Sequence, residues 1–109
     1  MAELGGDAPA GLTFDFSEDH DGCPLVRLRG ELDMSNVGRL ESAAAPLIAK
    51  SPKRLVVDAS ELEFADSSAI ALLVRWANVI DAVEIRHPPA LLRRVIARMG
   101  LSQRLQVSP

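Results

Sequence analysis

The stretch LVVDASELEFADSSAIALLV, residues 55–74, contains two apolar segments that are separated by polar residues. Leu55 to Val57 are consecutive and apolar, which is typical of a central strand that is covered on both faces. After Asp66 the apolar residues recur at helical spacing. A buried strand followed directly by an apolar helix predicts a sheet with helices packed against it.

The segments before this stretch extend the pattern. Residues 12–16 and 24–30 alternate apolar and polar side chains, and the acidic turn between them indicates an antiparallel hairpin. Apolar residues recur at helical spacing over residues 36–49. Pro46 is expected to bend or shorten that helix, because proline removes a backbone hydrogen bond.

The segments after it complete the domain. Residues 82–87 indicate a strand, and the helix that follows starts with proline and ends before Gly100. Its apolar residues form one predicted stripe, namely Leu91, Leu92, Val95, Ile96 and Met99. Residues 103–107 suggest a short last strand.

The order of elements is therefore β-β-α-β-α-β-α with a short closing strand. This order predicts a single α/β domain over residues 12–109, a mixed β-sheet with helices packed mainly on one face. Residues 1–11 are predicted to be a flexible N-terminal tail because of their glycine, alanine, proline and acidic content.

Composition excludes several classes of function. The net charge of −3 provides no basic field for nucleic acid, and an aromatic content of 4 % provides few stacking platforms. The single cysteine, Cys23, cannot form an internal disulfide, which fits a reducing compartment. The sequence has no secretion signal pattern and no apolar run of the roughly 20 residues that a membrane span needs. We therefore expect a cytoplasmic protein that neither binds nucleic acid nor inserts into a membrane.

The acidic residues are unevenly distributed along the chain. Six of them are expected to meet at one end of the sheet: Glu31, Asp33, Asp58, Glu61, Glu63 and Asp66. These residues either solvate loops or form an acidic rim around a site that faces a basic partner.

The triplet Asp66, Ser67 and Ser68 lies where the strand ends and the helix begins. Asp66 is a good N-cap, because its carboxylate can accept hydrogen bonds from backbone N–H groups of the first turn. A nucleophilic serine is disfavoured, since only His20 and His87 are available and no G-x-S-x-G turn occurs. The remaining alternatives are a simple helix cap and a phosphoacceptor serine.

The helix after the triplet is apolar on two sides. Ala69, Leu72 and Trp76 lie along the second side. Such a helix is either deeply buried or covers the core with one face and a partner with the other. Both interpretations remain open from the residues alone.

Three segments resemble the STAS domain, which anti-sigma factor antagonists and sulfate transporters share. They are LRGELD (28–33), LVVDASELEFADSSAIALLV (55–74) and HPPALLRRVIARMGL (87–101). The pieces occur in the family's order over roughly residues 12 to 107, and it is their combination that is specific. The resemblance implies an anti-sigma factor antagonist, a regulatory binding module with no catalysis of its own, no metal site and no cofactor.

The resemblance also implies roles for particular residues. An anti-sigma factor with serine kinase activity would phosphorylate Ser67, with Ser68 as the alternative acceptor, and a phosphatase would restore the free serine. The unphosphorylated protein would bind the anti-sigma factor and release the sigma factor. The predicted contact residues are Asp33, Asp66, Ser67, Ser68, Ala69, Leu72 and Trp76.

Two family glycines after the triplet are replaced by Ala69 and Ala71. A methyl group there suits a helix but stands where a kinase would approach the backbone. Trp76 and the segment HPPALLRRV also resemble a second branch of the family, the STAS accessory subunits of lipid-transporting ABC systems. Such subunits bind an ATPase and need no phosphoserine, so this branch is the alternative function.

Overall fold

A computed structural model describes residues 11–108 of the chain. Its elements are β1 (Leu12–Glu18), β2 (Pro24–Leu32), α2 (Val37–Ala49), β3 (Arg54–Ala65), α3 (Ser67–Val79), β4 (Ala82–Arg86), α4 (Ala90–Arg98) and β5 (Leu105–Ser108). The predicted order of elements is confirmed, including the short last strand. The predicted tail, residues 1–11, lies outside the described residues apart from Gly11.

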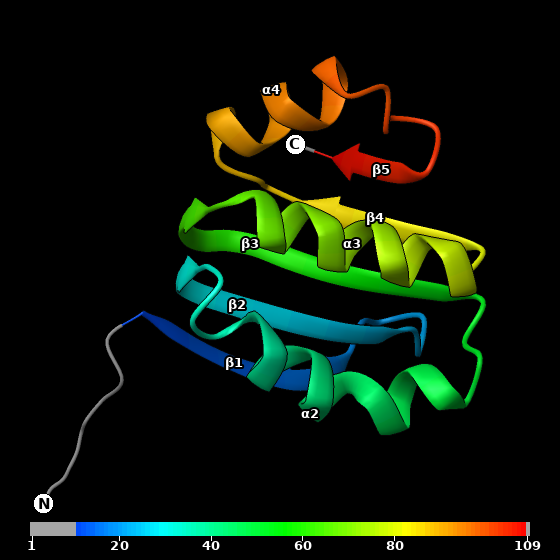
Figure 1. Cartoon of the computed structure of the whole chain (residues 1–109). Coiled ribbons are helices and arrows are strands. Elements are labelled where there is room, and N and C mark those ends of the chain that lie inside the picture. Colours follow the sequence, from blue (N-terminus) through cyan, green and yellow to red (C-terminus); the bar gives the residue numbers. More distant parts are fainter. Residues whose placement is uncertain (1–10, 109) are drawn as a thin grey trace, which may run out of the picture.

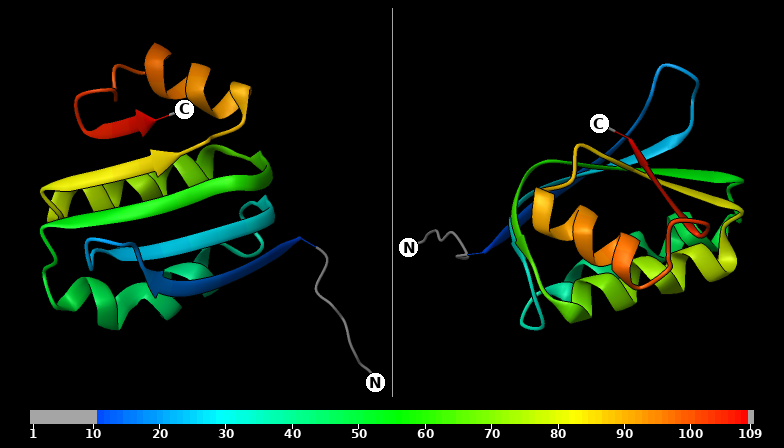
Figure 2. Two further views of the ribbon diagram at one scale, coloured as in Figure 1. Left: turned by 180° about the vertical axis from the view of Figure 1, so that it is seen from behind. Right: turned by 90° about the horizontal axis from the view of Figure 1, so that it is seen from above.

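The five strands form one mixed sheet in the order β1-β2-β3-β4-β5. β1 is antiparallel to β2, whereas β2, β3, β4 and β5 are parallel to one another. Each helix connects a parallel strand to the next strand in the same direction. Because such crossovers are right-handed, α2, α3 and α4 lie on the same side of the sheet, as Figures 1 and 2 show. The predicted mixed sheet with helices on one face is confirmed.

The core lies between the sheet and these helices. Leu55 and Val57 in β3 are 1 % exposed and face the helices, together with Val83 and Ile85 in β4. Val56 points to the opposite face of the sheet, because side chains alternate along a strand, and it too is fully buried. β3 is therefore the central strand that its apolar run predicts.

The opposite face of the sheet carries paired charges. The Arg27 guanidinium lies 3.3 Å from the Asp58 carboxylate, and Arg29 contacts both Asp15 and Glu61 at 2.9 and 3.1 Å. The register of β2 with β3 aligns each arginine with its acidic partner. Asp58 and Glu61 are thus neutralised on this face, which excludes them from the alternative of an acidic rim around a site.

The structure gives the ends of β3 and α2. β3 continues to Ala65, directly before the triplet, because Glu31 and Leu32 of β2 still pair with its last residues. Pro46 does not shorten α2, which continues to Ala49, so that part of the expectation is wrong. Pro46 is exposed, so water can bind the backbone carbonyl that proline leaves without its helical hydrogen bond.

Gly30 allows the hairpin to close beside the β2–α2 loop. Its φ of +96° favours glycine, and a Cβ atom there would lie 1.9 Å from the Gly11 carbonyl oxygen. That oxygen accepts a hydrogen bond from the Glu31 N–H at 2.6 Å. The GELD segment therefore needs glycine at its first position for a steric reason.

Candidate functional site

The carboxylate of Asp66 organises the turn between β3 and α3. Its Oδ1 atom accepts hydrogen bonds from the backbone N–H groups of Ser68 and Ala69, at 2.9 and 3.2 Å. The Ser68 hydroxyl donates to the same atom at 2.5 Å. The predicted N-cap is confirmed, and these bonds satisfy donors that would have no partner within the helix.

Asp66 also connects this turn to the loop between β2 and α2. Its Oδ2 atom accepts a hydrogen bond from the Met34 N–H at 3.1 Å, and its own N–H donates to the Leu32 carbonyl at 3.2 Å. Hydrogen bonds from the Ser68 hydroxyl and from the backbone of Ala69, Met34 and Ser68 hold the pKa of Asp66 below its ordinary value. Asp66 is therefore charged at neutral pH and joins the two loops at this end of the sheet.

Asp33 lies in the second of these loops, directly before Met34. Its Oδ1 atom accepts from the N–H and the hydroxyl of Ser35, at 3.0 and 2.6 Å. The side chain of Asn36, which is only 6 % exposed, bonds the Asp33 N–H and the Glu31 carbonyl. The loop is thus held by its own side chains, and it brings the two predicted aspartates to one end of the sheet.

The two serines differ in their surroundings. Ser67 is the first residue of α3 and is exposed, and its hydroxyl makes no hydrogen bond within residues 11–108. The Ser68 hydroxyl is half-buried and donates to Asp66. The structure therefore leaves the Ser67 hydroxyl accessible, whereas Ser68 belongs to the cap.

The apolar residues that were predicted to contact a partner are buried in the structure. Ala69 and Leu72 are fully buried, and Trp76 is 3 % exposed, so none of them is available to a partner. α3 packs against α2 on one side and against the sheet beneath it, and together these neighbours cover both apolar sides of the helix. Of the two interpretations that the sequence left open for this helix, deep burial is therefore the correct one.

Other apolar side chains are exposed near the triplet. Met34 is 79 % exposed in the loop that bonds to Asp66, and Phe64 is 44 % exposed two residues before Asp66. Neither follows from helical periodicity. Met34 lies in a loop and Phe64 lies near the end of β3, where helical spacing does not apply.

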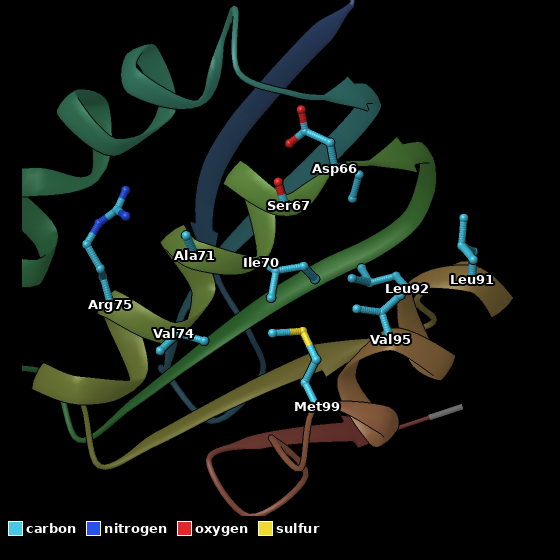
Figure 3. Close-up of a pocket in the computed structure, with 11 residues that line it drawn as sticks. Asp66, Ser67, Ile70, Ala71, Val74, Arg75, Leu91, Leu92, Val95 and Met99 are labelled. Atoms are coloured by element: carbon cyan, nitrogen blue, oxygen red, sulfur yellow. The ribbon is translucent and has the colours of Figure 1, made fainter.

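An apolar groove of about 490 Å³ runs between α3 and α4, with Asp66 and Ser67 at one end (Figure 3). Its other lining residues are Ala65, Ile70, Ala71, Val74, Arg75, Leu91, Leu92, Val95 and Met99. The apolar stripe predicted for this segment is divided: Leu92 and Ile96 are buried, whereas Leu91 and Met99 are 57 % and 59 % exposed. The sequence feature that could have indicated this exposed half is the width of the stripe, which is broader than one buried face requires.

The comparison with protein families identifies the fold as that of a known domain. Residues 16–107 match the family described as "Mlab, STAS domain". The chain belongs to the STAS domain family, and the matched range contains β2, β3, β4, the three helices and the Asp66 turn.

Individual relatives are similar over most of their length. The chain is 30 % identical over 99 residues to the anti-sigma-F factor antagonist RsfB of Mycobacterium tuberculosis, covering 88 % of this chain and 80 % of that protein. The crystal structure of an anti-sigma factor antagonist from Mycobacterium paratuberculosis is 31 % identical, with a TM-score of 0.81, and covers 94 % of this chain and 89 % of that chain.

The antagonist SpoIIAA shares the fold at lower identity. Its unphosphorylated form aligns with a TM-score of 0.73 at 19 % identity, over 89 % of each chain. Its phosphorylated form, from Bacillus, aligns with a TM-score of 0.71 at 20 % identity, over 89 % of this chain and 92 % of that chain.

Within residues 11–108, the helices lack the length and apolar character that crossing a membrane requires.

Proposed function

We propose that this protein is an anti-sigma factor antagonist controlled by phosphorylation of Ser67. In its unphosphorylated form it binds an anti-sigma factor with serine kinase activity in the cytoplasm and so frees a sigma factor. The kinase then phosphorylates Ser67, the complex dissociates, and a phosphatase regenerates the free serine. The protein itself performs no catalysis in this cycle.

The observation that carries this proposal is the difference between the two serines. A phosphoacceptor must present its hydroxyl to the kinase, and the Ser67 hydroxyl is exposed and unbonded within the described residues. Ser68 donates its hydroxyl proton to Asp66, so its phosphorylation would break the helix cap. Ser67 is therefore the better acceptor.

The phosphate would act at the interface rather than through refolding. It would add a charge of about −1.5 to −2 at pH 7 beside the carboxylate of Asp66. None of the hydrogen bonds of Asp66 involves the Ser67 side chain, so the cap persists after modification. An anti-sigma factor that fits the uncharged surface then meets a bulky anion, which accounts for dissociation.

The exposure of the side chains indicates which residues form the surface that contacts the anti-sigma factor. The polar members Asp33, Asp66, Ser67 and Ser68 remain in it. The exposed side chains of Met34 and Phe64 replace the three buried apolar residues. The methyl group of Ala69 is buried beneath the turn and therefore cannot block a kinase that approaches Ser67 from solvent.

The relatives support this assignment over the alternative. The proteins with 30–31 % identity are named anti-sigma factor antagonists. An accessory subunit of an ABC transporter is therefore not favoured.

The test uses the anti-sigma factor kinase encoded in the same genome. We expect the kinase to transfer radioactive phosphate from ATP to the wild-type protein and to Ser68→Ala, but not to Ser67→Ala. Ser67→Asp should bind the kinase at least tenfold more weakly, while its circular dichroism spectrum stays unchanged. Equal labelling of Ser67→Ala and the wild type would show that Ser67 is not the acceptor.

A further inference from the structure

The groove between α3 and α4 is apolar along its floor and basic along one side. Val74 and Ala71 line it from α3, Leu91 and Val95 line it from α4, and Met99 lines it from the C-cap of α4, as Figure 3 shows. α3 and α4 contain no acidic residue. Asp66, at the end next to Ser67, is the one acidic residue among the lining residues. Away from that end, the surface around the floor is suited to a ligand that is both apolar and negatively charged.

The arginines of α4 differ from the other arginines in their contacts within residues 11–108. Seven arginines within residues 11–108 form an ion pair or a hydrogen bond: Arg27, Arg29, Arg39, Arg54, Arg75, Arg86 and Arg104. Arg93, Arg94 and Arg98 are exposed and form none in the described part of the chain. Their charges are available to an acidic partner.

Helical spacing places two of these arginines beside the groove. Arg94 follows Leu91 by three residues, and Arg98 follows Val95 by three, so each lies next to a lining side chain on the helix surface. Arg93 instead lines the opposite side of α4, with Ile96 and Ala97. Arg94 and Arg98 therefore form a basic edge along the apolar floor.

The dimensions of the groove fit a third helix. The nine residues of α4 span about 13 Å, which matches about two turns of a helix packed alongside it. An amphipathic helix in such a groove presents apolar anchors at i, i+3 or i+4, and i+7, and its flanking residues meet the rim. A basic rim selects acidic flanking residues.

We propose that this groove binds an acidic amphipathic helix of the anti-sigma factor. The proposal rests on the proposed function and extends the contact surface from the Ser67 turn onto α4. Ser67 lines the end of the groove, so its phosphate would place negative charge beside a negatively charged helix. The groove thereby contributes to the release that phosphorylation causes.

The experiment measures the affinity of the same anti-sigma factor kinase for groove variants by isothermal titration calorimetry. The first pair is Ala71→Glu, which places a carboxylate in the groove, and Ala97→Glu, the same change on the opposite side of α4. The second pair is the double variant Arg94→Glu/Arg98→Glu and its control Arg93→Glu. We expect at least tenfold weaker binding for Ala71→Glu and for the double variant, and less than twofold change for the controls.

Labelling of Ser67 separates this inference from the proposed function. If the kinase labels Ser67 and binds all four variants as tightly as the wild type, the groove is not part of the interface and this inference is wrong, while the proposed function stands. If the kinase neither binds nor labels the wild-type protein, the proposed function fails and the groove inference fails with it. Equal losses for the groove variants and their controls would also overturn it, because they indicate a general charge effect.

Two further probes test the chemistry of the occupant. A designed helical peptide with leucine at i, i+3, i+4 and i+7 and glutamate at the flanks should shift the amide resonances of α3 and α4. Its lysine-flanked analogue should not. If both peptides shift these resonances equally, the basic edge has no selective role. Vesicles with 30 % phosphatidylglycerol should not bind, and binding to them that Arg94→Glu/Arg98→Glu abolishes would replace the helix with a membrane surface.

Discussion

Replacing Asp66 with alanine removes every hydrogen bond that its carboxylate accepts. These bonds come from the backbone of Ser68, Ala69 and Met34 and from the Ser68 hydroxyl. The first two backbone bonds form the N-cap of α3, and the third connects the two loops at this end of the sheet. The substitution therefore has two effects: it destabilises the domain, and it makes the surface around Ser67 less well ordered.

The expected loss is about 2 kcal/mol. An N-cap aspartate contributes about 1 kcal/mol, with a range of about 0.5–2 kcal/mol between proteins. The bond from the exposed Met34 N–H adds about 1 kcal/mol, below the usual value for a charged acceptor because water can replace it. In a domain of about 100 residues, this loss lowers the melting temperature by about 10 °C.

Urea unfolding followed by circular dichroism measures this loss, with Asp81→Ala as the control. Asp81 is exposed and accepts no hydrogen bond within residues 11–108, so its replacement should change the free energy of unfolding by less than about 0.5 kcal/mol. A loss below about 0.5 kcal/mol for Asp66→Ala would refute the reasoning, since the cap alone should exceed it.

Three other outcomes follow from the structure. Gly30→Ala should lower stability by about 3 kcal/mol or prevent folding, because its Cβ atom meets the Gly11 carbonyl; thermal melting checks this. The pKa of Glu41 is lowered mainly by its hydrogen bond from Arg75, so its contribution is complete above the ordinary value of 4.5 and lost as pH falls through the lowered pKa. Urea titrations from pH 7 to pH 3 should therefore show a shallower decline in Glu41→Gln. Kinase binding should weaken from 50 mM to 500 mM salt, since charged groups line the proposed interface; affinity that stays constant would indicate an apolar contact.

Much of the fold could be predicted from local patterns. The apolar run at Leu55 to Val57 and the helical spacing after Asp66 specified the central strand and the helix that follows it. Asp66 itself was recognisable as the cap, because capping depends on a side chain and the backbone two or three residues away. Short-range interactions of this kind are fully contained in neighbouring residues.

The tertiary structure decided which residues the site can use. Ala69, Leu72 and Trp76 have the same spacing whether a partner or the domain itself covers them, and only the packing of α3 against α2 and the sheet buries them. The choice between Ser67 and Ser68 likewise depends on the direction of each hydroxyl relative to Asp66. Their order in the sequence contains no such direction.

The groove is the clearest feature that only the tertiary structure provides. Leu91 and Met99 belong to the same apolar stripe as Leu92 and Ile96, and periodicity does not distinguish between them. Three-dimensional packing buries one half of the stripe against the sheet and leaves the other half facing α3 across the groove. The sequence by itself determined the elements and their apolar faces, because these depend on neighbouring residues. The tertiary structure decided which of these faces remain uncovered, because the sheet sets how the helices are placed relative to one another.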